Sequence, residues 1–169
     1  MTDKLTPQRR SWNMSRIRSA DTKPEMVLRS VLHRMGFRFR LHRRGLPGRP
    51  DIVLPKYHTV IFVHGCFWHQ HPGCIEAVRP KTNEKYWAAK LEGNVKRDKK
   101  NRRALRKEGW RVFRFWECQI EKDPIRIAMR IAKELRGGLR KSQRNTLSRH
   151  GLSCLGLPSP VRATTKSGR

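Results

Sequence analysis

The chain has 169 residues and a formal net charge of +27, because 40 Lys and Arg stand against 13 Asp and Glu. This length accommodates one compact domain and a tail, and the charge indicates a polyanionic partner, most often nucleic acid, rather than neutral metabolites. The sequence has no run of about 20 apolar residues and begins with a polar stretch, so we expect neither a membrane span nor an export signal.

The first half of the chain predicts an arm, a helix and three short strands. Residues 1–20 are polar and basic, with Trp12 as a large apolar anchor, and we expect an arm that docks on DNA or on the domain surface. Thr22 and Glu25 have the spacing of a capping box, and apolar residues follow at helical spacing, which predicts a helix over 21–36. Alternating or β-branched apolar runs predict strands at 37–41, 51–54 and 59–63.

The second half predicts two helices on either side of a strand, followed by a tail. A charged helix is expected over 84–108, a strand over 111–116 and a last helix from Asp123 onward. From residue 137 the chain has seven basic and no acidic residues, which predicts a disordered basic tail over 137–169. The order of elements indicates one α/β or α+β domain over 21–136, with a small mixed sheet flanked by helices.

A carboxylate stands at the mouth of one predicted strand. Asp51 follows Pro50 and opens an apolar strand, where a rigid chain can fix a hard oxygen ligand for a divalent ion. An aspartate that merely caps a turn after proline is the alternative. The next strand runs into His64, where many metal-dependent nucleases carry an acidic residue and a lysine. Other groups must therefore complete such a centre, with Glu25 as a candidate carboxylate and His64 and His69 as candidate proton carriers.

Potential metal ligands are concentrated in residues 64–74, HGCFWHQHPGC. Cys66, His71 and Cys74 could wrap one ion, and Cys118 could complete the Cys₃His ligand set typical of structural zinc. Free buried thiols with solvated histidines are the alternative, and a secreted disulfide framework is disfavoured because no export signal is present. A closed four-ligand shell leaves no position for catalysis, so we assign zinc to structure and a separate magnesium to chemistry.

Aromatic side chains lie beside these candidate ligands. Phe67 and Trp68 are consecutive, so their side chains diverge and at least one is expected to project outward. Planar apolar side chains can wedge between base steps, and Trp87, among many basic residues, could do the same. Core packing is the alternative, and we favour it for Trp110 and Trp116.

Taken together, these stretches resemble the very short patch repair (Vsr) endonucleases, which belong to the restriction-endonuclease-like superfamily. The resemblance covers residues 8–136, and its matching stretches are Asp21-Thr22 with Glu25, LPGRPDIV, VIFVHGCFWH, NVKRDKKN and GWRVFRFWEC. It implies a three-layer core with a structural zinc site. It also implies an enzyme that nicks DNA 5′ of the mispaired thymine in T:G mismatches, which arise by deamination of 5-methylcytosine, so that a polymerase replaces a short patch.

The resemblance also implies a role for individual residues. Asp51 and the backbone carbonyl of Val63 would bind catalytic Mg²⁺. His69 would be the general base for the attacking water, Glu25 would help to orient that water, and His64 would contact the reacting phosphate. Structural Zn²⁺ would be bound by Cys66, His71, Cys74 and Cys118. The DNA would be intercalated by Phe67, Trp68 and Trp87 and contacted further by Trp12, Arg49, Lys85, Lys96 and Arg97.

The implied partner is double-stranded DNA with a T:G mismatch, with mismatch-repair proteins as further partners. We expect a bacterial, cytoplasmic, nucleoid-associated monomer without membrane contact. A restriction or homing-type endonuclease that cuts a matched site is one alternative, but it does not explain the aromatic wedge. A non-catalytic zinc-bound DNA-binding module is another and does not explain Asp51. A basic RNA-binding protein is the third and would need neither metal.

Overall fold

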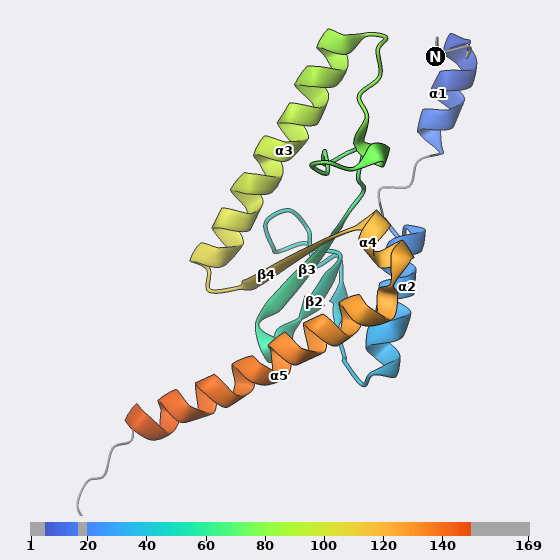
Figure 1. Ribbon diagram of the computed structural model, residues 1–169. Helices are drawn as coiled ribbons and strands as arrows, with labels where there is room; N and C mark the ends of the chain where they lie inside the picture. The colour runs from blue at the N-terminus through green and yellow to red at the C-terminus, as the bar shows by residue number, and fades with distance from the viewer. Residues whose placement is uncertain (1–5, 17–19, 150–169) are drawn as a thin grey trace, which may run out of the picture.

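A four-stranded mixed sheet forms the centre of the computed structural model, which describes residues 6–16 and 20–149 (Figure 1). Its strands, in spatial order, are β1 (Arg40–Leu41), β2 (Ile52–Leu54), β3 (Thr59–His64) and β4 (Arg111–Trp116). β2 pairs antiparallel with β1 and with β3, whereas β3 and β4 run parallel. The predicted small mixed sheet is confirmed.

Helices cover both faces of this sheet. The described helices are α1 (Pro7–Ser15), α2 (Lys23–Arg34), α3 (Glu84–Lys107), α4 (Glu117–Lys122) and α5 (Pro124–Arg149), with short 3₁₀ turns at Pro55–Tyr57 and Ile75–Ala77. α2 and α5 pack on one face and α3 lies on the other (Figure 1). This is the three-layer α/β arrangement expected from the resemblance. None of the helices described over 6–16 and 20–149 has the length and apolar character needed to cross a bilayer.

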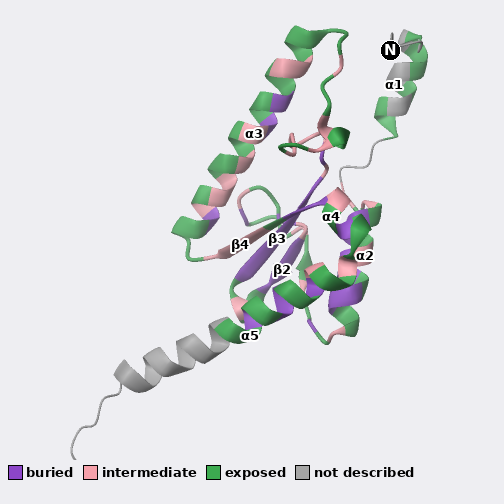
Figure 2. Ribbon diagram, in the orientation of Figure 1, coloured by how far each residue is buried: buried purple, intermediate pink, exposed green. Residues whose placement is uncertain are grey.

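The central strand β3 separates two apolar clusters. All six of its residues are buried, and because side chains alternate along a strand, Ile61 and Val63 face α2 and α5 while Val60 and Phe62 face α3. Figure 2 shows the buried residues gathered where α2, β2 and β3 meet. Because β3 and β4 are parallel, both end at the same edge of the sheet, where His64 pairs with Trp116. This edge opens into the loop that carries the candidate site.

Several predicted elements differ from those observed. Only the last two residues of the strand predicted at 37–41 are paired, because Phe37 is buried in the core directly after the turn at Gly36. α4 was not predicted, since the sequence indicates no element between the strand over 111–116 and the helix from Asp123. α1 occupies most of the predicted arm, whose residues 1–5 and 17–19 lie outside the described part.

The tail predicted from residue 137 is helical over its first part. α5 continues to Arg149, so the structure places a helix over 137–149, where the sequence predicts a tail without one. The two glycines at its start oppose a helix by about 1 kcal/mol each, but the following stretch is rich in Leu, Arg, Lys and Gln, which extend a helix once it has been nucleated by a packed first half. Residues 150–169 lie outside the described part of the chain.

Candidate active site and metal cluster

A cleft of about 1000 Å³ lies at the edge of the sheet where β3 ends. Asp51 enters it from the start of β2, Val63 and His64 from the end of β3, and Glu25 from the first turn of α2. One face of α3 contributes Lys90, Asn94, Arg97, Asp98, Asn101 and Arg102. The four predicted catalytic residues, Asp51, Glu25, His64 and His69, all line this cleft.

Asp51 is fixed by the neighbouring strand. The backbone N–H of Val63 donates a hydrogen bond to Asp51 Oδ2 at 2.7 Å. Burial raises the pKa of Asp51 to about 6, the Val63 hydrogen bond acts in the opposite direction, and the charge of Glu25 raises it further. A carboxylate that is expensive to ionise and lines a cleft suits a divalent cation, whose charge favours the ionised form. The chemistry of this site therefore fits a hard metal ion.

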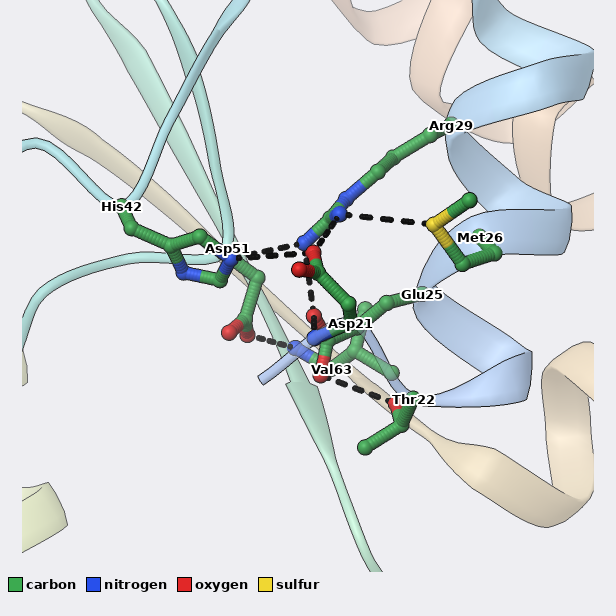
Figure 3. Close-up of polar contacts among 8 residues, drawn as sticks. All are labelled: Asp21, Thr22, Glu25, Met26, Arg29, His42, Asp51 and Val63. Carbon is green, nitrogen blue, oxygen red and sulfur yellow. Dashed lines mark hydrogen bonds and ion pairs between the residues drawn. The ribbon is translucent and has the colours of Figure 1, made fainter. Parts of the chain in front are cut away.

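Glu25 is buried and held by three donors (Figure 3). Its Oε1 accepts a hydrogen bond from the Thr22 hydroxyl at 2.8 Å, and its Oε2 accepts one from the Asp21 N–H at 3.0 Å and one from Arg29 Nη2 at 2.6 Å. The predicted capping box between Thr22 and Glu25 is incorrect in detail. The Thr22 hydroxyl bonds to the Glu25 carboxylate instead of capping the helix N–H groups.

His64 and His69 stack on each other beside a carboxylate that the sequence prediction missed. Their ring centroids lie 3.9 Å apart, and His69 Nδ1 lies 2.5 Å from Asp98 Oδ2 on α3. Burial lowers the pKa of His64 to about 3, with the charge of His69 as the next cause, so His64 is neutral. Burial opposes ionisation of Asp98, but the hydrogen bond from His69 and nearby positive charges outweigh it, so the pKa of Asp98 lies below its ordinary value. A carboxylate that holds one imidazole nitrogen leaves the other available for proton transfer.

The four predicted zinc ligands converge. Ligand atoms of Cys66, His71, Cys74 and Cys118 all lie within 4.8 Å of one another. His71 Nδ1 lies 3.4 Å from the sulfur atoms of Cys66 and Cys118, and these three cysteines form no disulfide. Burial raises the pKa of the Cys66 thiol to about 12 and also raises that of Cys118. The geometry can hold a metal ion, and it ties the loop after β3 to the first turn of α4.

Phe67, Trp68 and Trp87 form one half-buried aromatic group beside the cleft. Their ring centroids are separated by 5.0 Å, 5.5 Å and 6.1 Å. Trp68 also lines the cleft itself. Of the two tryptophans expected in the core, Trp116 is buried and Trp110 packs against the cluster on the α3 face, so that prediction is confirmed.

The predicted DNA contacts fall into two groups. Arg49 and Arg97 line the cleft, whereas Lys85 and Lys96 are exposed on α3 away from its lining. Trp12 is 47% exposed on α1, with the guanidinium groups of Arg9 and Arg16 over its ring at 4.8 Å and 4.5 Å. Lys90, Asn94, Asn101 and Arg102 line the cleft but were not chosen from the sequence, although their spacing places them on one helical face.

Comparisons with known proteins show the family to which the sequence is similar. The family model of the DNA mismatch endonuclease Vsr matches residues 2–74. The type II nicking enzyme V.XorIIP of Xanthomonas oryzae is 52% identical over 120 residues, which cover 71% of this chain and 88% of the relative. The type II nicking enzyme V.NmeAIP of Neisseria meningitidis is 44% identical, covering 74% of this chain and 89% of the relative. The DNA mismatch endonuclease Vsr of Escherichia coli is 44% identical, covering 70% of this chain and 73% of the relative.

Proposed function

The chain belongs to the Vsr family of DNA endonucleases, and on this premise we propose that it nicks DNA 5′ of the mispaired thymine in T:G mismatches. Such mismatches arise by deamination of 5-methylcytosine, and the nick starts very short patch repair. The observation that carries the proposal is the cleft in which Asp51 and the His69–Asp98 pair lie next to the aromatic group of Phe67, Trp68 and Trp87.

The chain supplies three functions for phosphodiester hydrolysis. Asp51 and the backbone carbonyl of Val63 would hold Mg²⁺, which would stabilise the charge that develops on the phosphate. His69, held through Nδ1 by Asp98, accepts the proton of the attacking water at Nε2, and Glu25 helps to orient that water. His64, neutral and buried, contacts the reacting phosphate.

The Cys66, His71, Cys74 and Cys118 cluster holds structural Zn²⁺ in this proposal. Three thiols and one imidazole are a usual zinc donor set, and a metal at this site favours ionisation of thiols that burial otherwise keeps protonated. The ion fixes the loop that carries both His69 and the aromatic pair Phe67 and Trp68. Zinc therefore acts on catalysis through position and not through chemistry.

Mismatch selection depends on the aromatic group of Phe67, Trp68 and Trp87. A mismatched step stacks less well than a matched one, so wedging these rings beside it costs less. The basic residues of the cleft, including Arg49 and Arg97, bind the phosphate backbone, with Lys85 and Lys96 as outlying contacts. Trp12 and its two arginines clamp the opposite groove.

The cellular setting follows from the relatives and belongs to the proposal. The three relatives are bacterial proteins, which supports action on DNA in the cytoplasm. Action as a monomer, association with the nucleoid and recruitment of mismatch-repair proteins to the nick are further parts of the proposal. A nick at a matched recognition sequence is the second candidate function. It is favoured by the names of the two type II nicking enzymes.

A nicking assay tests the proposal directly. Duplexes that differ only in T:G against C:G, with each strand labelled in turn, are incubated with the protein and Mg²⁺. We expect one nick 5′ of the mispaired thymine, lost when Asp51 is replaced by alanine while mismatch binding is retained. Equal nicking of the C:G duplex would favour the second candidate. Nicking by Asp51→Ala at the wild-type rate would contradict the assignment of Asp51.

A further inference from the structure

Arg29 is a buried cation next to the catalytic carboxylates (Figure 3). Its side chain is only 7% exposed. Nη1 pairs with Asp21 Oδ1, and Nη2 donates to Glu25 Oε2 at 2.6 Å. Nη2 also lies 3.0 Å from Nε2 of His42. The catalytic roles proposed above make no use of this guanidinium.

Stability is a poor explanation for an arginine at this position. Removing a guanidinium from water costs several kcal/mol, and apolar residues that replace a buried ion pair usually give an equally stable fold. Arg29 Nε has no hydrogen-bond partner among the described residues, which adds a cost of about 1–3 kcal/mol. A residue retained at such a cost is better explained by what it does to its neighbours.

The neighbour that Arg29 controls most directly is Glu25. Of the three donors to the Glu25 carboxylate, the Thr22 hydroxyl and the Asp21 N–H are neutral, and only Arg29 is charged. Glu25 and Asp51 line the same cleft, so the charged donor that holds Glu25 acts within the site of the carboxylate proposed to bind Mg²⁺. The guanidinium therefore fixes where the Glu25 carboxylate lies in this cleft.

Arg29 also occupies a place where a metal ion could bind. Ligand atoms of Asp21, Glu25 and His42 lie within 4.8 Å of one another, close enough to share an ion. Arg29 contacts one of these atoms from each residue, namely Asp21 Oδ1, Glu25 Oε2 and His42 Nε2. A divalent cation and the guanidinium cannot both occupy that position.

We propose that Arg29 is a positioning residue for strand nicking. Its guanidinium takes the place of a divalent cation between Asp21, Glu25 and His42, and so keeps Glu25 in the cleft for the reaction and reserves metal binding for Asp51. The inference rests on the Asp51-centred hydrolysis proposed above, but it does not depend on which mismatch or sequence is the substrate.

Single-turnover nicking rates test the positioning role. Arg29→Met should lower the rate by about 10–100-fold, as is typical when a group that orients a site is lost, with DNA affinity unchanged. Arg29→Lys should be intermediate, because lysine keeps the charge but not the two-pronged geometry. In a Glu25→Gln background Arg29→Met should cause no further loss, since both act through one carboxylate. Arg34→Met, at the exposed end of the same helix, is the matched control and should nick like wild type.

Mn²⁺ binding, followed by electron paramagnetic resonance, gives a readout that is independent of activity. We expect Asp51→Ala to bind no Mn²⁺ between Asp21, Glu25 and His42. The double variant Asp51→Ala with Arg29→Met should bind about one Mn²⁺ ion per chain there. Replacing Asp21 with asparagine as well should abolish this gain. If Arg29 had only a structural role, its replacement would not change the number of Mn²⁺ ions bound per chain.

Three results would overturn the inference. The first is nicking by Arg29→Met at the wild-type rate. The second is that Arg29→Met lowers the nicking rate of Glu25→Gln by the same factor as that of wild type. The third is that Asp51→Ala with Arg29→Met binds no more Mn²⁺ than Asp51→Ala alone. If thermal unfolding shows that Arg29→Met does not fold, Arg29→Gln, which also removes the charge, takes its place in the rate comparison and in the Mn²⁺ measurement. If the wild type nicks a duplex other than T:G, the mismatch proposal fails, and the same variants are compared on the duplex that is nicked.

Discussion

Replacing Asp51 with asparagine should stabilise the protein when no divalent metal occupies the catalytic site. Burial raises the pKa of Asp51 from the ordinary value of 3.8 to about 6. At about 1.4 kcal/mol for each pH unit, the fold disfavours the ionised carboxylate by about 3 kcal/mol. Asparagine is uncharged and keeps an oxygen that can accept the Val63 N–H. The free energy of unfolding of Asp51→Asn should therefore exceed that of wild type by about 3 kcal/mol at pH 7.5.

The stability that Asp51→Asn gains over wild type must grow as the pH rises. Well below pH 4 the Asp51 carboxyl group is protonated in the folded and unfolded chain alike, so its removal changes nothing. Between pH 3.8 and about 6 the unfolded chain ionises first, and the folded state loses stability until the folded carboxyl group ionises as well. The free energy of unfolding of Asp51→Asn should exceed that of wild type by about 1 kcal/mol at pH 4.5 and by about 3 kcal/mol at pH 7.5.

Urea unfolding of the zinc-loaded protein in magnesium-free buffer measures this difference. Glu121→Gln, an exposed change of the same kind on α4, is the control and should leave stability unchanged within about 0.5 kcal/mol. Added Mg²⁺ should stabilise wild type but not Asp51→Asn, because asparagine lacks the negative charge that the proposed site needs to bind the ion. A stability difference that is the same at both pH values, or a variant less stable than wild type at pH 7.5, would refute the assignment of a costly buried carboxylate.

Three further outcomes are expected. Asp98→Asn should lower the nicking rate by about 10²-fold or more. Because the pKa of Asp98 lies below its ordinary value of 3.8, the variant should be less stable than wild type at pH 7.5, and urea unfolding should show that this difference shrinks as the pH falls below 3.8. Phe67→Ala with Trp68→Ala should lower the ratio of T:G to C:G affinity more than the C:G affinity itself, measured by competition binding; equal losses would contradict a wedge. Cys118→Ser should release zinc at a lower chelator concentration and melt at a lower temperature, measured by native mass spectrometry and calorimetry.

The sequence was most informative where apolar periodicity and packing agree. The predicted strands at 59–63 and 111–116 and the helix at 84–108 match β3, β4 and α3 to within one residue. The strand at 37–41 was overestimated, because alternation describes a half-buried chain whether or not it pairs with another strand. α4 was missed because six residues are too few to show a helical period.

The candidate site was largely predictable because its ligands are unusual residues in a short stretch. Cysteines and histidines between 66 and 74 stand out in any sequence, and Cys118 was found by its place after a strand. Asp98 and Arg29 were not found for the opposite reason. An acidic residue in a basic helix and an arginine on a helix both have the pattern of a solvated surface. Only the folding of α3 over the loop after β3, and of α2 against the loop that carries His42, shows what Asp98 and Arg29 contact.

The length of α3 bears on how much sequence the enzyme can inspect. Its cleft-lining residues run from Lys90 to Arg102, which at about 1.5 Å per residue is about 18 Å. Base pairs repeat every 3.4 Å, so this helix faces about five base pairs, or half a turn of duplex. Under the proposed function, a recognition window of that width, centred on the mismatch, would include only its immediate neighbours. Any preference for more distant bases must come from another element or from the ease with which the flanking duplex bends.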